Sequence, residues 1–216
     1  MKNIVSLFDY TGTWVEDYAS LACETGEYDV YCIDLEADGI DIADIGGAWL
    51  MEHLPADIHG LVAAPPCTHF SASGARWWAA KDGDGRTAQA IHLVRQVLRT
   101  VSLFEGREAD PDDPDEGEWP GLQWWCLENP VGRLARLVPE LGRASCYVEP
   151  WWWGDPWTKK TGLWGDFNPP ARRPDLEVDP IPEYMSKTVG VPRAERARFR
   201  STTPRGFARA FFEANP

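Results

Sequence analysis

Short apolar runs alternate with helical patterns over the first 130 residues, and this alternation constrains the fold more than any other feature. Four brief apolar runs predict buried strands: residues 3–8, 28–34, 60–64 and 122–127. Apolar residues recur at helical spacing in three stretches: roughly 14–24, 46–53 and 85–104. Strands that alternate with helices predict an α/β protein with a doubly wound, mostly parallel sheet.

Polar or reactive residues stand where each predicted strand ends. These residues are Asp9, Asp34, Cys67 and Glu128. The carboxyl ends of parallel strands lie at one edge of a sheet, and ligands of α/β proteins bind there. We therefore expect the four side chains to form a functional site at that edge.

Cys67 lies in AAPPCTHFS (residues 63–71), directly after two prolines that stiffen the end of a strand. The alternative is a packing role, because free cysteine is among the most buried residue types. A nucleophilic thiol needs partial ionisation and a nearby proton carrier. His69 is the nearest base in sequence, and Glu128 on a neighbouring strand can face the same pocket. A cysteine paired with a carboxyl group suits attack on a ring whose nitrogen must be protonated, such as cytosine.

Six motifs in this order resemble the DNA cytosine-5 methyltransferases, in the short form common in phage genomes. They are SLFDYTG (6–12), CID (32–34), GIDI (39–42), PPCTHFS (65–71), CLENP (126–130) and RSTTPRGFARAFF (200–212). The chain departs from the family at Tyr10 and Thr13, where glycine is common, and at Pro130, where valine is usual. Lys159 and Lys160 in TKKTGLWG stand as candidates for the family's arginine pair, without the bidentate fork of arginine.

The resemblance implies a Rossmann-like class I methyltransferase fold that binds S-adenosylmethionine and modifies a cytosine flipped out of DNA. The implied catalytic residues are Cys67 as nucleophile, Glu128 as the acid on ring nitrogen 3, and Asn129. The implied donor-binding residues are Phe8, Asp9, Thr11, Gly12, Asp34, Leu35, Asp41, Ile42 and Pro66. The implied substrate-binding residues are Ser71, Lys159, Lys160, Arg172, Arg173, Arg200 and Thr203.

The same resemblance divides the chain into three parts. Residues 1–165 are expected to form the donor-binding catalytic core, and 166–199 a short target-recognition segment with limited sequence readout. Residues 200–216 are expected to form a C-terminal helix that returns to the core, with Thr203 as its N-cap and Pro204 at its first position.

Charge is distributed unevenly along a chain whose formal net charge is -13. Residues 156–216 hold 11 Lys and Arg against 7 Asp and Glu, so this part is expected to meet a polyanion such as DNA. The expected phosphate contacts are Arg172, Arg173, Arg193, Arg196, Arg198 and Arg200. A solvated surface is the alternative. The 12 tryptophans are expected mainly in the core, with stacking on bases as the alternative.

The 5 cysteines include no C-x-x-C pair, which argues against a zinc site or a disulfide framework. No run of about 18 apolar residues predicts a membrane span, and no secretory signal is recognised. We expect a cytoplasmic protein, in the host cytoplasm if it is phage-encoded.

Three functions remain open at this point. The first is methylation of cytosine in DNA, and the second is modification of the base on another carrier, a free nucleotide or RNA. The third is a degenerate methyltransferase fold whose acidic surface binds a basic protein. Cys67 and Glu128 favour the two enzymatic readings, because a binding module needs neither residue.

Overall fold

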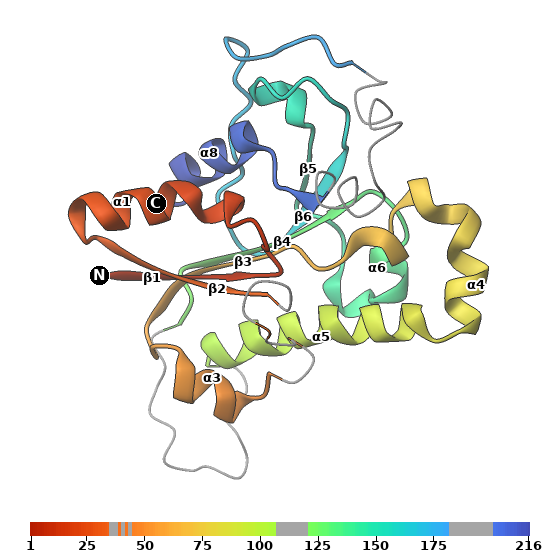
Figure 1. Ribbon diagram of the computed structural model, residues 1–216, viewed down its shortest axis with the longest axis horizontal. Coiled ribbons are helices and arrows are strands. Elements are labelled where there is room, and N and C mark those ends of the chain that lie inside the picture. Colours follow the sequence, from red (N-terminus) through yellow and green to blue (C-terminus); the bar gives the residue numbers. More distant parts are fainter. Residues whose placement is uncertain (35–38, 40–41, 43–44, 107–120, 182–200) are drawn as a thin grey trace.

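A computed structural model of the chain describes residues 1–34, 39, 42, 45–106, 121–181 and 201–216. A six-stranded sheet runs through it in the order β2-β1-β3-β4-β6-β5 (Figure 1). The strands are β1 (Lys2–Leu7), β2 (Tyr28–Ile33), β3 (Ile58–Ala63), β4 (Trp124–Pro130), β5 (Cys146–Val148) and β6 (Thr161–Trp164). The α-helices are α1 (Glu16–Thr25), α3 (Gly47–His53), α4 (Trp78–Gly83), α5 (Arg86–Phe104), α6 (Leu134–Leu137) and α8 (Arg205–Ala214).

The sheet is mixed, which corrects part of the predicted topology. Strands β2, β1, β3 and β4 are parallel, as the alternating pattern predicts. Strand β6 pairs antiparallel with both β4 and β5, so the sheet as a whole is not clearly doubly wound. The sequence analysis placed no strand after residue 127, because β5 and β6 are only three and four residues long and lie among tryptophans and glycines. The arrangement is α/β and consistent with a Rossmann-like fold in general.

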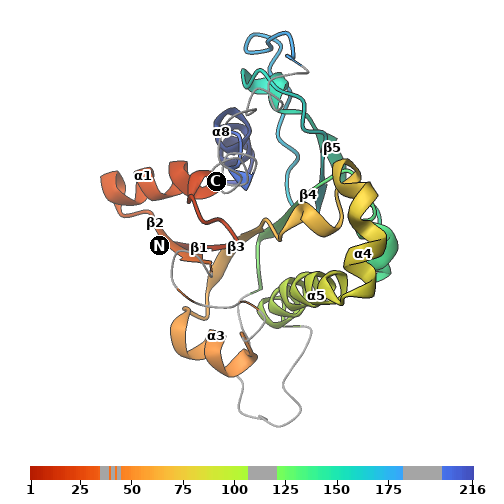
Figure 2. The same ribbon diagram turned by 45° about the vertical axis from the view of Figure 1, so that its right-hand side comes forward.

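Helices cover both faces of the sheet, with α3 and α5 on one side and α1 and α8 on the other (Figures 1 and 2). Successive strand residues therefore enter opposite apolar clusters: Val5 packs on the α5 side and Ile4 on the α8 side. This double burial explains the nearly continuous apolar runs of the parallel strands. The four predicted strands agree with β1, β2, β3 and β4 to within a few residues at each end.

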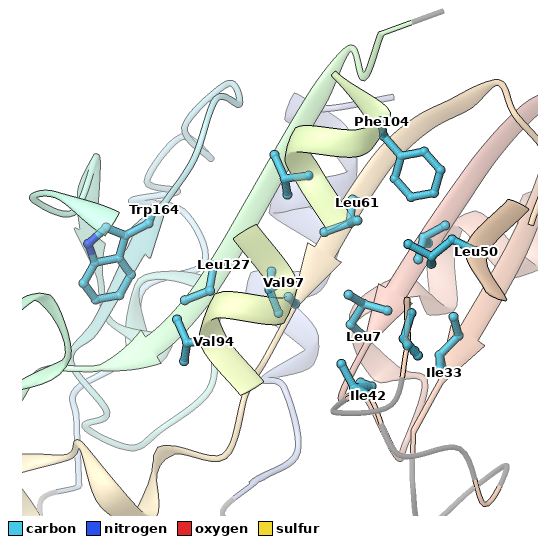
Figure 3. Close-up of a cluster of buried hydrophobic side chains, with 14 of the residues drawn as sticks. Leu7, Ile33, Ile42, Leu50, Leu61, Val94, Val97, Phe104, Leu127 and Trp164 are labelled. Carbon is cyan, nitrogen blue, oxygen red and sulfur yellow. The ribbon is translucent and has the colours of Figure 1, made fainter. Parts of the chain in front are cut away.

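On one face of the sheet, a stripe of apolar residues along helix α5 packs against the strands (Figure 3). The buried apolar positions of α5 recur every three or four residues: Ala90, Val94, Val97, Val101 and Phe104. They pack with Leu7 and Leu61 of the sheet. The helix predicted over 85–104 is confirmed, and its period of 3.6 is what orients the stripe toward the sheet.

Helix α8 begins one residue later than predicted, and Thr203 is not its N-cap. Pro204 has extended backbone and precedes the first helical residue, Arg205, while Thr203 is buried upstream. The backbone N–H of Gly206 instead donates to Oδ2 of Asp155 (3.0 Å). A carboxylate 51 positions away thus satisfies one of the unpaired donors of this helix end. No local pattern signals such a cap.

Aromatic packing fixes α8 onto the sheet. Phe211 is fully buried. The centroid of its ring lies 5.5 Å from that of Trp14, 5.6 Å from that of Trp124 and 5.7 Å from that of Phe167. Phe207 and Ala210 are buried on the same helix face. In the part of the chain that the structure describes, no helix is both long and apolar enough to span a membrane.

Replacing Phe211 by alanine should therefore lower the free energy of unfolding by about 3–5 kcal/mol, because the change leaves a cavity among buried rings. Chemical denaturation measures the loss. Arg205→Ala in the same helix, whose side chain is 78% exposed, serves as the control and should change stability by less than about 0.5 kcal/mol. Equal effects of the two changes would contradict the packing role of Phe211.

Candidate active site

The register of the parallel strands brings four chain segments to one edge of the sheet. Leu7 of β1 pairs with Ile33 of β2 and with Ala63 of β3, and Ala63 pairs with Leu127 of β4. The next residues along the chain are Phe8, Asp34, Ala64 and Glu128. Four of the segments singled out in the sequence thus meet at one edge. Glu128 and Asn129 lie within β4, which extends past the predicted end at residue 127.

In the turn after β1, several hydrogen-bond donors surround the buried carboxyl group of Asp9. Asp9 accepts hydrogen bonds from the Thr11 hydroxyl (3.2 Å), the Ser6 hydroxyl (3.4 Å) and the Trp14 backbone N–H (3.0 Å). Burial raises the pKa of Asp9 despite these bonds, and the charge of Asp34 adds to the rise. Asp9 and Asp34 therefore lie close enough to interact electrostatically.

Backbone geometry at this turn is unusual. Phe8 has φ 62°, a left-handed conformation that no other non-glycine residue of the described ranges adopts. Gly12 has φ 64°, and its N–H donates to the Asp9 carbonyl (2.9 Å). A residue with such a strained backbone conformation persists where the surrounding structure holds it in place, and such residues concentrate at functional sites.

The remaining expected donor residues have different environments. Ile42 is buried in the apolar cluster on the α5 side (Figure 3). Pro66 is exposed at the start of the turn that carries Cys67. Leu35 and Asp41 lie outside the described residues.

Cys67 begins a single 3-10 turn, Cys67–His69, at the end of β3. Its side chain is half-buried, and its carbonyl accepts hydrogen bonds from the N–H groups of Phe70 (3.0 Å) and Ser71 (2.9 Å). Asn129, fully buried in β4, donates from Nδ2 to the Pro65 carbonyl (3.0 Å). The expected catalytic asparagine thus holds the approach to Cys67.

Lys159 places a cation beside Glu128 and near enough to Cys67 to interact with it electrostatically. Its Nζ lies 3.2 Å from Oε1 of Glu128, and the two side chains are only 13% and 12% exposed. Burial lowers the pKa of Lys159, but the charges of Glu128 and Cys67 outweigh that effect and raise it. A buried ion pair is weak evidence for stability, because desolvation of both charges is costly.

The two candidate lysines separate in the structure. The backbone N–H of Lys159 donates to Oε2 of Glu149 (3.1 Å), which turns its side chain toward β4. Lys160 instead places Nζ 5.5 Å from the centre of the Tyr147 ring. Only Lys159 of the pair faces both Glu128 and Cys67.

Residues 131–133 join the segment after the Cys67 turn to the segment ahead of β6 through backbone hydrogen bonds. Val131 donates to the Lys160 carbonyl (3.0 Å), Ala72 donates to the Val131 carbonyl (3.1 Å), and Arg133 donates to the Phe70 carbonyl (2.9 Å). Gly132 lies so near the Cys67 turn that a Cβ atom would come within 1.9 Å of the Phe70 carbonyl oxygen. Only glycine permits this approach.

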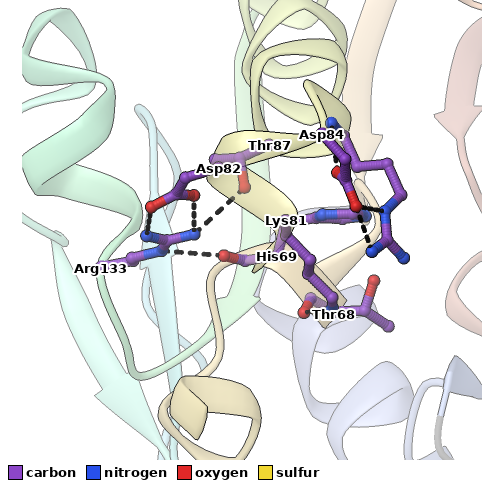
Figure 4. Close-up of polar contacts among 8 residues, drawn as sticks. Thr68, His69, Lys81, Asp82, Asp84, Thr87 and Arg133 are labelled. Atoms are coloured by element: carbon purple, nitrogen blue, oxygen red, sulfur yellow. Dashed lines mark hydrogen bonds and ion pairs between the residues drawn. The ribbon is translucent and has the colours of Figure 1, made fainter. Parts of the chain in front are cut away.

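Arg133 adds a side-chain clamp that the sequence analysis missed (Figure 4). Its guanidinium donates to both carboxylate oxygens of Asp82 (2.8 and 2.7 Å) and to the His69 carbonyl (3.0 Å). It also lies 4.5 Å from the centre of the Trp78 ring and donates to the Thr87 hydroxyl (3.2 Å). In the printed sequence Arg133 looks like any surface arginine, and no spacing rule connects it to Asp82.

The expected phosphate-binding arginines carry acidic partners where the structure describes them. Arg172 forms a two-pronged ion pair with Glu177, and Arg173 pairs with Asp175 (2.8 Å). The Arg172 guanidinium also stacks 5.0 and 5.1 Å from the rings of Trp151 and Trp152. The positions outside the described residues are Arg193, Arg196, Arg198 and Arg200.

Two further substrate candidates have local partners. The Ser71 hydroxyl lies 2.9 Å from the Ser73 hydroxyl, and Thr203 is buried beside the start of α8. Several tryptophans are core residues, as expected, whereas Trp77 is 55% exposed next to the Cys67 turn. Among the described residues, no group of three or more His, Cys, Asp and Glu side chains is arranged to hold a metal ion.

Comparison with models of known protein families gave no match. Comparison with curated proteins gave no match either.

The Asp82–Arg133 pair should make stability depend on pH in a defined window. Hydrogen bonds from Arg133 lower the pKa of Asp82 from 3.8 to about 2. A carboxyl group with a lowered pKa stabilises the fold above its unfolded pKa, and this contribution is lost as pH falls toward the folded value. The stability difference between the wild type and Asp82→Asn, measured by urea unfolding, should be largest above pH 3.8 and shrink toward about pH 2.

Asp84→Asn is the matched control. Asp84 pairs with Arg86, whose side chain is 54% exposed, whereas Asp82 pairs with Arg133, whose side chain is 5% exposed. Loss of a partner costs more when the remaining charge is buried, so Asp84→Asn should destabilise much less. A stability difference for Asp82→Asn that stays constant over this pH window would contradict the assignment.

Proposed function

We propose that the chain methylates cytosine at ring carbon 5 in DNA, with S-adenosylmethionine as methyl donor and a covalent intermediate on Cys67. The observation that carries the proposal is the Lys159–Glu128 pair beside Cys67, where the carboxyl ends of parallel strands meet. In this proposal the four parallel strands belong to a class I methyltransferase fold. A module that only bound a basic partner would have no use for a buried ion pair next to a thiol.

Cys67 supplies the nucleophile in this scheme. Its thiolate forms a bond to carbon 6 of cytosine, and the electron pair of the carbon 5–carbon 6 double bond moves to carbon 5. Charge that develops on the ring is met at nitrogen 3 by a proton from Glu128. Carbon 5 then forms a bond to the methyl group, and the sulfur–methyl bond of the donor breaks with its electron pair left on the donor sulfur as a neutral thioether. A base removes the proton from carbon 5, and the bond between carbon 6 and the Cys67 sulfur breaks to restore the ring and the thiolate.

Lys159 supports the proton at nitrogen 3. Its ammonium lies 3.2 Å from the Glu128 carboxylate, so the ion pair holds one transferable proton, which is on the Lys159 nitrogen. That proton can be passed through Glu128 as the ring becomes more basic. The ammonium also stabilises negative charge on Cys67, which favours the attacking form of the thiol.

The turn after β1 and the end of β2 offer the residues that would hold the donor. S-adenosylmethionine supplies an electrophilic methyl group when bound. Asp34, at the end of β2, would accept hydrogen bonds from ribose hydroxyls, and the Phe8 ring would pack on an apolar part of the donor. Gly12 has open space where a Cβ atom would be, which leaves the turn accessible. The caged Asp9 fixes the turn that lacks the family's additional glycines.

A second substrate class, cytosine on a free nucleotide or on RNA, is favoured by a different observation. Arg172 and Arg173 are each paired with a carboxylate, which weakens their attraction for a run of phosphates. A substrate with few phosphates, or one already single-stranded, needs fewer such contacts and avoids the cost of base flipping.

Covalent trapping tests the proposal directly. A DNA oligonucleotide with 5-fluorocytosine, mixed with the protein and S-adenosylmethionine, should give an adduct of protein plus DNA plus one methyl group by intact-mass analysis. Fluorine at carbon 5 cannot leave as a proton, so the carbon–sulfur bond persists. Cys67→Ala should give no adduct.

The same experiment on RNA and on free 5-fluorocytidine nucleotides separates the two substrate classes. An adduct with one of these and none with DNA would replace DNA as the substrate. No adduct with any carrier, although calorimetry shows donor binding, would refute covalent catalysis by Cys67.

Glu128→Gln should lower kcat by about 10²–10⁴-fold, because an amide can donate a hydrogen bond to nitrogen 3 but cannot transfer a proton to it. Donor affinity measured by calorimetry should stay nearly unchanged, since Asp34 and the β1 turn are intact. Glu140→Gln, an exposed glutamate paired with Arg95, is the control and should behave like the wild type. Wild-type turnover in Glu128→Gln would remove Glu128 from the chemistry.

A further inference from the structure

Two adjacent residues of helix α4, Lys81 and Asp82, connect this helix to the Cys67 turn and to Arg133 (Figure 4). Asp82 points toward Arg133 and forms the clamp described above. Lys81 points to the other side, where its Nζ donates to the Thr68 carbonyl (2.5 Å). Neighbouring residues of a helix diverge by about 100°. One short helix can therefore be anchored on one side and hold the turn on the other.

Lys81 differs from the other cation near Cys67 in what surrounds it. Lys159 is engaged by the Glu128 carboxylate. Lys81 has no ion pair with a carboxylate among the described residues, and its hydrogen bond goes to a neutral carbonyl. The nearby Asp84 is taken by the guanidinium of Arg86. The charge of Lys81 is therefore left available to the adjacent thiol.

The electrostatic surroundings agree with this geometry. Burial and the positive charge of Arg86 lower the pKa of Lys81, while the charge of Cys67 acts in the opposite direction. Among the described residues, the charged groups at the Cys67 turn include Lys81 of α4 and Lys159 ahead of β6, the latter paired with Glu128 of β4. Arg133, which is bound to Asp82, and Arg86, which is bound to Asp84, also act on this turn through His69. His69 on the turn itself has a pKa lowered by burial and by the neighbouring cations, which keeps its ring neutral near pH 7.

We propose that Lys81 is a positioning residue for Cys67: it holds the catalytic turn through the Thr68 carbonyl and stabilises the Cys67 thiolate with its charge. The Asp82–Arg133 clamp keeps α4, and with it the Lys81 ammonium, against the turn. The inference deepens the proposed function, because it rests on Cys67 as the nucleophile. Its test requires neither DNA nor methyl donor, so the two can fail independently.

The test follows alkylation of Cys67 by iodoacetamide as a function of pH, quantified by peptide mass spectrometry. Thiolate sulfur displaces iodide from this neutral reagent, so the rate follows the ionised fraction of the thiol. Lys81→Met should slow Cys67 alkylation at pH 7 by about three- to tenfold, as expected for loss of one charge near a partly exposed site. At about pH 10, where the thiol is ionised in both proteins, the rates should converge.

Three controls give the experiment its meaning. Cys23, an exposed cysteine in the same protein, should react equally in both proteins. Lys2→Met removes the same charge at the amino end of β1, the end of the strand away from the site, and should leave the Cys67 profile unchanged. Lys81→Arg keeps the charge and a donor, so it should restore most of the wild-type rate.

A salt titration of the wild type at pH 7 tests the same charge without any substitution. Raising the salt from about 0.05 M to about 1 M screens exposed charges and should slow Cys67 alkylation, whereas Lys81→Met should respond less. Coincident pH profiles of the wild type and Lys81→Met would overturn the proposal. So would a rate for Lys81→Arg as low as that for Lys81→Met, because shape and not charge would then govern the thiol.

Discussion

The registration of β1, β3 and β4 is the constraint on which the rest of the site depends. Leu7, Ala63 and Leu127 lie opposite one another in neighbouring strands. The turn after β1, the segment that leads to Cys67, and Glu128 therefore all follow at the same edge of the sheet. A shift of one residue in β4 would turn Glu128 to the opposite face of the sheet. Apolar clusters on both faces oppose such a shift, because Trp124, Cys126 and Leu127 of β4 would leave their buried positions. Core packing and the arrangement of the candidate site are thus set by the same pairing.

Within that frame, the charges near Cys67 are held by contacts of different strength. Lys159 and Glu128 are buried and mutually compensating, and a cation there costs less because a carboxylate lies 3.2 Å away. Lys81 is closer to solvent and relies on a carbonyl, so its influence is smaller and sensitive to salt. In the proposed reaction, the Lys159–Glu128 pair would supply the proton for the ring nitrogen, and Lys81 would stabilise the thiolate.

Period and strand-end chemistry made the α/β class, the α5 helix and the meeting of four segments predictable from the sequence. These signals are local: a buried strand is apolar along its length, and a helix repeats every 3.6 residues. The antiparallel β5–β6 pair, the Asp155 cap of α8 and the Arg133 clamp were not predictable in this way. The cap and the clamp each join residues 51 positions apart, and the β5–β6 strands have no pattern of their own to mark their pairing. The residue types involved, glycine, aspartate and arginine, are common on surfaces. Lys159 was anticipated only as one of two lysines, and its burial singled it out.

Gly132 and Arg133 show why the clamp belongs with the chemistry. The backbone of Gly132 touches the Cys67 turn where no side chain fits, and the next residue holds the same turn and α4 with its guanidinium. Stability alone would not require an arginine that is 5% exposed to be bound by a carboxylate that is 47% exposed, because an apolar contact there costs no desolvation. A directional clamp is useful where a turn must keep one geometry while a substrate base enters beside it. Rigidity of that kind supports catalysis by holding the nucleophile close to its attacking position.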